Sequence, residues 1–110
     1  MSMILQGTTP SLEIVIDSND FSVTDVQKLE ILIWQDNSRP SVYGLEDVIV
    51  DPDSNSYIIE FGESFTLSLK PSAVLFWQMR CVMPDGNIVG TVKSRGIPVS
   101  ELKSKELLGE

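Results

Sequence analysis

The sequence contains no histidine and only one cysteine, and these two shortages remove much of enzyme chemistry. Without an imidazole there is no Ser-His-Asp or Cys-His catalysis and no His-ligated zinc or haem. A lone Cys81 can form neither an intramolecular disulfide nor a thiolate zinc site, so the fold depends on its hydrophobic core. These absences remove much of the ordinary hydrolase repertoire, and we expect no metal and no cofactor.

Positive charge is also scarce. Eight Lys and Arg stand against sixteen Asp and Glu, a net charge of -8, which argues against nucleic acid as a partner. Residues 1–69 carry two bases and twelve acids, a net charge of -10, whereas residues 70–110 carry six bases and four acids, a net charge of +2. This polarity either serves only solubility or lets the acidic body of one copy dock on the basic end of another.

Long hydrophobic runs are absent too. No stretch approaches the 18 apolar residues of a membrane-spanning helix, and the first residues lack the basic and apolar regions of a signal peptide. We expect synthesis in the cytoplasm and no contact with a membrane. The length favours one domain over residues 1–110, with an N-terminal arm over residues 1–10.

What the sequence does have is a period of two. Apolar residues recur at every second position in 11–17, 27–35 and 74–83, which predicts strands with one buried face. Further strands are predicted over 42–50 with an interruption at Gly44, and over 57–61, 64–69 and 88–93. Turn-forming residues occupy 51–55 and 84–87. Six to seven such strands predict an all-β fold, an immunoglobulin-like antiparallel β-sandwich.

The last residues break this pattern and predict a short helix over 100–110. Ser100 can act as its N-cap, Glu101 and Lys105 form an i,i+4 pair, and Gly109 stands at the stop position. A helix this short is not stable alone in water. Its leucines must therefore dock on this domain or on a neighbouring chain; they are Leu102, Leu107 and Leu108.

One acidic segment has the spacing of a metal site. Asp51-x-Asp53-x-Asn55 copies the first half of a calcium loop, but Ser56 stands where the loop needs glycine and Gly62 where it needs glutamate. A solvated turn is the better interpretation. A pair of carboxylates for glycoside hydrolysis remains open, because only a distance in space would identify it.

The aromatic residues divide by their phase on the strands. Tyr57 and Trp77 share the apolar phase and are expected in the core, as is Cys81, a buried and unreactive thiol. Trp34 and Phe76 lie on the mixed phase. They are the better surface candidates, for contact with another protein or as a platform for a sugar ring.

Three short segments carry a resemblance to a known family: Gln6-Gly-Thr-Thr-Pro10, the Pro84-Asp-Gly-Asn87 hairpin and Val99-Ser-Glu-Leu102. With them the sequence resembles small structural proteins encoded in the tail and baseplate regions of prophages of Gram-positive gut bacteria. It is similar to the immunoglobulin-like N-terminal domain of a phage upper-baseplate protein.

The resemblance implies a structural module without catalytic residues. Its partners would be other virion or tail proteins or copies of itself, and its final location would be the virion. A carbohydrate-binding β-sandwich is the alternative. Contacts with a partner are expected in the N-terminal segment, at Trp34 and in the C-terminal segment, through Gln6, Thr8, Thr9, Pro10, Trp34, Leu102, Leu107 and Leu108.

Overall fold

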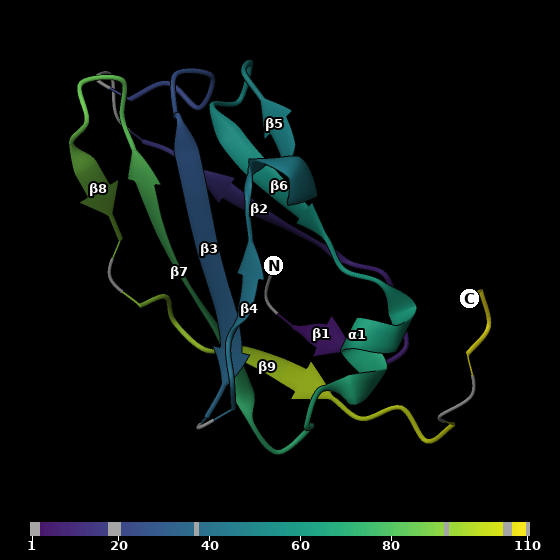
Figure 1. The fold of residues 1–110 in the computed structure, drawn as a ribbon. Coiled ribbons are helices and arrows are strands. Elements are labelled where there is room, and N and C mark those ends of the chain that lie inside the picture. Colours follow the sequence, from purple (N-terminus) through teal and green to yellow (C-terminus); the bar gives the residue numbers. More distant parts are fainter. Residues whose placement is uncertain (1–2, 18–20, 37, 92, 105–106, 110) are drawn as a thin grey trace.

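The computed structural model describes residues 3–17, 21–36, 38–91, 93–104 and 107–109. They form nine strands, one short α-helix and one 3-10 turn (Figure 1). In chain order the elements are β1 (Ile4–Leu5), β2 (Ser11–Val15), β3 (Lys28–Gln35), β4 (Ser41–Tyr43), η1 (Leu45–Asp47), β5 (Ile49–Asp51), β6 (Ser56–Glu60), α1 (Glu63–Ser68), β7 (Val74–Val82), β8 (Ile88–Gly90) and β9 (Ile97–Ser100).

The strands form two sheets, and the predicted all-β class is confirmed. The large sheet has the order β1-β9-β7-β3-β4, and β8 also pairs with β7; the small sheet has the order β2-β6-β5. All pairs are antiparallel except β1 with β9, which run parallel. In Figure 1 the large sheet lies in front of the small one, and α1 lies at the lower end beside β1 and β9.

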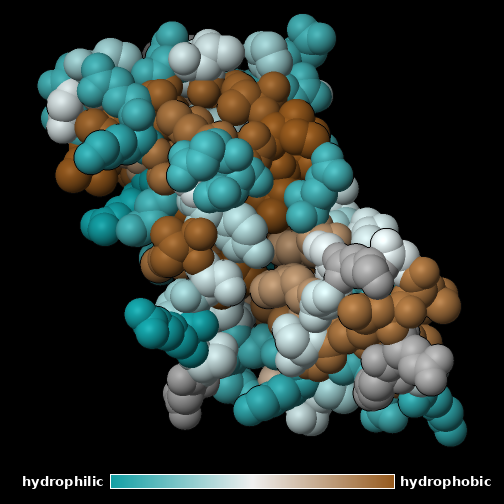
Figure 2. All heavy atoms as spheres, turned by 45° about the vertical axis from the view of Figure 1, so that its right-hand side comes forward, coloured by the Kyte–Doolittle hydropathy of each residue, from teal (hydrophilic) through white to brown (hydrophobic). Residues whose placement is uncertain are grey.

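The predicted segment 42–50 is interrupted at Gly44, as expected. Its two halves belong to different sheets, because β4 pairs with β3 whereas β5 pairs with β6. The turn η1 carries the chain across. Figure 2 brings this side of Figure 1 forward and shows hydrophobic residues gathered over its upper part. The crossing therefore leaves apolar side chains near the surface, and Ile49 is 48% exposed.

The strand after the 84–87 turn is shorter than the predicted 88–93, because β8 ends at Gly90. A strand that was not predicted, β9, pairs with β7 farther along. Between β8 and β9 side-chain hydroxyls replace backbone partners: Thr91 Oγ1 accepts from Met79 N at 3.1 Å, and Ser94 Oγ accepts from Trp77 N at 2.9 Å. The edge of β7 is thus satisfied along most of its length by one segment that bends away from regular pairing.

The core lies between the facing sides of the sheets and follows the predicted alternation. Tyr57 is fully buried, and its hydroxyl donates to the Val23 carbonyl at 2.8 Å. Trp77, expected in the core, is only partly buried and packs at its edge. The buried residues from the predicted phases are Leu12, Ile14, Leu29, Ile31, Ile33, Tyr57, Ile59, Leu75, Met79 and Cys81.

The strand predicted over 64–69 is wrong, because Glu63–Ser68 forms helix α1. The buried residues here are Glu63, Thr66 and Leu69, a spacing of three that suits a helix and not a strand. Thr66 is buried because its hydroxyl donates to the Thr8 carbonyl at 2.8 Å and accepts from Gly7 N at 3.0 Å. A sequence pattern that counts threonine as exposed cannot find this helix.

The helix predicted over 100–110 is also wrong in the part of the segment that the structure describes. Ser100, the expected N-cap, is the last residue of β9, and its carbonyl accepts from Gln6 N at 3.0 Å. Residues 101–104 and 107–109 form no helix, and residues 105, 106 and 110 lie outside the described residues. Strand pairing with β1 uses the backbone groups that a helix would need.

In the described chain no helix is long and apolar enough to cross a membrane.

Asn55 connects the β5–β6 turn to the loop that follows β2. Its φ of 51° lies in the left-handed region, which asparagine tolerates. Its amide donates to the carbonyls of Ile16 at 3.1 Å and Phe21 at 2.9 Å and accepts from Val23 N at 2.9 Å. Every hydrogen-bonding group of this side chain is therefore engaged within the fold.

We expect Asn55→Ala to lower the free energy of unfolding by about 2–3 kcal/mol, because it leaves three backbone groups without partners and puts alanine, which tolerates positive φ less well than asparagine, in the left-handed region. Asn55→Gly should lose less, since glycine removes the conformational cost but not the lost hydrogen bonds. Equilibrium unfolding in urea measures both. Equal stability of the alanine variant and the wild type would contradict this role.

Candidate functional site

The segment with calcium-loop spacing serves the turn between β5 and β6. Asp51 Oδ1 accepts from Asp53 N at 3.1 Å and from Ser54 N at 3.3 Å, while Asn55 holds the neighbouring loop. Among the residues that the structure describes, no group of three or more Cys, Asp or Glu side chains could hold a metal ion. The Asp51 carboxylate thus shapes the backbone of this turn.

The large sheet instead exposes a broad mixed surface, which we call the outer face. It consists of the side chains of β3, β4, β7 and β8 that point away from the core, and cross-strand pairing places them in rows. Two apolar members are strongly exposed, Val42 at 62% and Ile88 at 65%. The outer face comprises Lys28, Glu30, Leu32, Trp34, Val42, Phe76, Gln78, Arg80, Val82 and Ile88.

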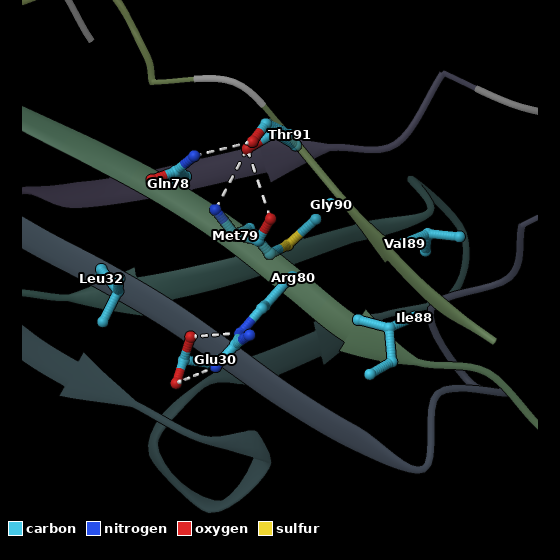
Figure 3. Close-up of a pocket in the computed structure, with 9 residues that line it drawn as sticks. All are labelled: Glu30, Leu32, Gln78, Met79, Arg80, Ile88, Val89, Gly90 and Thr91. Carbon is cyan, nitrogen blue, oxygen red and sulfur yellow. Dashed lines mark hydrogen bonds and ion pairs between the residues drawn. The ribbon is translucent and has the colours of Figure 1, made fainter. Parts of the chain in front are cut away.

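An ion pair lies near the middle of the outer face. Arg80 Nε donates to Glu30 Oε1 at 2.7 Å across the β3–β7 pair, and this hydrogen bond and the carboxylate charge raise the pKa of Arg80. Figure 3 shows Leu32 and Ile88 on either side of the pair. A shallow groove of about 470 Å³ runs over these side chains toward Thr91. An apolar surface with a central arginine is a composition typical of protein interfaces.

Trp34 and Phe76 both lie on the outer face, as their phase predicted, and are partly buried. They are cross-strand neighbours with ring centroids 5.9 Å apart. Lys93 Nζ lies 4.3 Å from the centroid of the Phe76 ring, a cation–π contact. One ring face of Phe76 is therefore covered by a cation instead of being open for a sugar.

The N-terminal segment expected to bind a partner is largely part of the fold. Gln6 is buried; its Nε2 donates to the Leu69 carbonyl at 2.6 Å and its Oε1 accepts from Leu102 N at 3.0 Å. Thr8 and Thr9 are exposed and Pro10 is partly exposed. The structure thus leaves Thr8 and Thr9 accessible but uses Gln6 to join β1, the end of α1 and the C-terminal segment.

The C-terminal segment docks on its own chain. Leu102 packs against Gly7, so closely that a Cβ added to Gly7 would lie 2.7 Å from the Cδ2 atom of Leu102. Farther on, the Glu63 carboxylate accepts from Leu108 N at 2.5 Å and from Gly109 N at 2.8 Å. The side chains of Leu107 and Leu108 remain 45% and 93% exposed. The C-terminal segment therefore docks through its backbone and the Leu102 side chain, and the side chains of Leu107 and Leu108 still face solvent.

The sequence interpretation missed Glu63 and most of the outer face. Glu63 is 5% exposed and lies in the helix that was predicted as a strand. Val42 and Ile88 lie on short edge strands, where alternation is too brief to assign a face. The opposite charges of Glu30 and Arg80 were the available signal, since both lie on outward phases of neighbouring strands.

Cys81 is buried, as predicted. Its thiol is 2% exposed, and burial raises its pKa. The thiolate is the reactive form, so the fold suppresses the chemistry of this residue.

Comparisons with known proteins assign the chain to no family. No protein-family model matches the chain, and no curated protein matches it significantly.

We expect Glu63→Gln to free the end of the C-terminal segment, because an amide offers one oxygen where the carboxylate offers two. Exchange of the Leu108 and Gly109 amide hydrogens should become about 10- to 100-fold faster, as expected for losing a hydrogen bond to a charged group. NMR-detected hydrogen exchange measures this. Glu101→Gln, an exposed change in the same segment, is the control, and equal exchange in both variants would argue against the clamp.

We expect Cys81 to react with iodoacetamide at pH 8 about 100-fold more slowly in the native protein than in urea. Because its folded pKa is raised, the protonated thiol favours the native state below the ordinary thiol pKa, and this contribution is lost as the pH rises through the folded value. Between pH 8 and pH 10 the wild type should lose more stability than Cys81→Val. Rapid native labelling would show that the thiol is accessible.

Proposed function

We propose that this chain is a non-enzymatic structural module of a phage or prophage particle. It acts in the tail or baseplate region through protein–protein contacts, and the outer face is its principal contact surface. The observation that carries this proposal is the outer face itself, where exposed Val42 and Ile88 flank the Glu30–Arg80 pair. Exposed apolar patches on a small domain commonly mark interaction sites.

The composition of this face favours a protein over a sugar. Central arginine and aromatic residues surrounded by apolar side chains are typical of interfaces between proteins. A sugar site needs an open aromatic ring beside hydrogen-bonding groups, whereas one ring face of Phe76 carries Lys93 and the Gln78 amide donates to the Thr91 carbonyl at 3.1 Å.

The topology supports an immunoglobulin-like sandwich as the finer fold. In immunoglobulin terms, β2, β6 and β5 correspond to strands B, E and D, and β3, β4, β7 and β9 to strands C, C′, F and G. The parallel pairing of β1 with β9 corresponds to a first strand that joins the opposite sheet beside strand G. Such sandwiches are common as assembly and adhesion modules, so the fold is compatible with the proposed role.

The residues that carry the family resemblance make structural contacts that a shared fold would require. Gln6 joins β1 to the C-terminal segment, and Gly7 adopts a φ of 75° where a side chain would meet Leu102. In the other segment, Gly86 has a φ of 87° and Asp85 Oδ1 accepts from Asn87 N at 2.9 Å. The resemblance therefore supports a shared architecture, and the proposed setting in a particle follows from it.

We expect the tagged chain to co-purify with phage particles after prophage induction in its native host, and Val42→Lys and Ile88→Lys to reduce its incorporation at least about tenfold. A buried lysine without a partner is costly at an interface. Quantitative immunoblots of gradient-purified particles measure this. Ser72→Lys, which adds the same charge at an exposed turn, is the control.

Circular dichroism melting of each variant separates a lost contact from a lost fold. Recovery of the wild-type chain only in particle-free fractions would refute the role in the particle. Full incorporation of folded Val42→Lys and Ile88→Lys proteins would refute the assignment of the outer face.

A further inference from the structure

We infer that the partner of the outer face is a second copy of this chain, which contributes the solvent side of its small sheet. This inference rests on the proposed function of the outer face and specifies its occupant. The outer face and the solvent side of the small sheet have opposite charges and matching exposed apolar side chains.

The solvent side of the small sheet, which we call the acidic face, carries negative charge only. Strand pairing places Glu13, Glu60 and Asp51 on it, and β2, β5 and β6 contain no Lys or Arg. Its remaining members are Ser11, Val15, Ile49, Ser56 and Ile58. The charged residues of the acidic face therefore sum to -3.

The outer face has the opposite sign although the chain as a whole is strongly acidic. Its own charged residues are Lys28, Arg80 and Glu30, a sum of +1, and Lys93, which lies over the Phe76 ring, raises the sum to +2. Glu30 is already engaged by Arg80. A chain with a net charge of -8 thus places three of its eight bases on one face of the molecule.

The apolar parts of the two faces also match. The acidic face exposes Val15 at 57% and Ile49 at 48%, and the outer face exposes Val42 at 62% and Ile88 at 65%. On the acidic face Ile49 and Glu13 both flank Ile58 across the sheet, so apolar and charged side chains are neighbours, as they are on the outer face. Docking would cover apolar surface on both copies while placing bases opposite acids.

The acidic face is small, because it consists of eight side chains on strands of five, three and five residues. The contact therefore belongs to the weak class, below the roughly 800 Å² that each partner contributes to a standard interface. Because the two faces lie on opposite sheets, the contact is heterologous. Each copy keeps one face free, and the assembly grows into a ring or a linear stack instead of stopping at a dimer.

A charge-swap experiment tests the inference. One variant, Glu13→Lys with Glu60→Lys, makes both faces basic; the other, Lys28→Glu with Lys93→Glu, makes both faces acidic. Sedimentation velocity at concentrations up to about 1 mM should show oligomers of the wild type, beyond the dimer, and a monomer for each variant. An equal mixture of the variants should associate again, because each unlike pair of faces is then complementary.

Circular dichroism checks that each variant is folded. The Lys28→Glu and Lys93→Glu changes disturb no backbone contact, which keeps the test valid if loss of the Glu13–Ser56 hydrogen bond weakens the other variant. A wild-type chain that stays monomeric, or variants that associate as it does, would overturn the inference.

The particle assay keeps this result separate from the proposed function. A monomeric wild type whose incorporation is still lost in Val42→Lys and Ile88→Lys would leave the outer face bound to a different protein. A monomeric wild type with unchanged incorporation of those variants would refute both the association between copies and the assignment of the outer face as a contact surface.

Discussion

The pairing of β3 with β7 is the interaction on which the rest of the molecule depends. The two strands are in register over eight residue pairs, from Lys28 with Val82 to Gln35 with Leu75. Because side chains alternate across a sheet, this one register assigns both surfaces at once. Leu29, Ile31 and Ile33 enter the core, while Glu30, Leu32 and Trp34 form the outer face. A slip by one residue would exchange the two sets, so the core and the outer face are specified by the same pairing.

A second set of constraints holds the lower end of the molecule in Figure 1, where buried polar groups join segments distant in sequence. Gln6, Thr66 and Glu63 each use a side chain to satisfy backbone groups of the N-terminal segment, of α1 or of the C-terminal segment. Buried polar groups are tolerated when they are hydrogen-bonded, and they then specify one arrangement. The Gln-Gly-Thr-Thr-Pro segment lies in the same region, and Gln6, Gly7 and Thr8 make hydrogen bonds of this junction.

The sequence predicts the sheets well and the junctions poorly. The long alternating strands, the interruption at Gly44, the turn at 84–87 and the burial of Tyr57 and Cys81 follow from period and turn chemistry. Helix α1 could not be predicted because its buried positions include Glu63 and Thr66, whose burial depends on partners far away in sequence. The C-terminal helix fails for a similar reason, since local capping signals at Ser100 are overridden by pairing with β1. The outer face was only partly foreseen, through Trp34 and Phe76.

The parallel pairing of β1 with β9 also determines how the domain responds to mechanical load. Ile4 lies opposite Val99 and Leu5 opposite Ser100, so the chain approaches β1 at one end of the pair and leaves β9 at the other. Tension between the two chain ends therefore pulls the strands along their length. The hydrogen bonds between them are strained together, in shear, and do not open one after another as in a peeled hairpin. A chain pulled at these two points therefore resists stretching until the β1–β9 pair breaks as a unit.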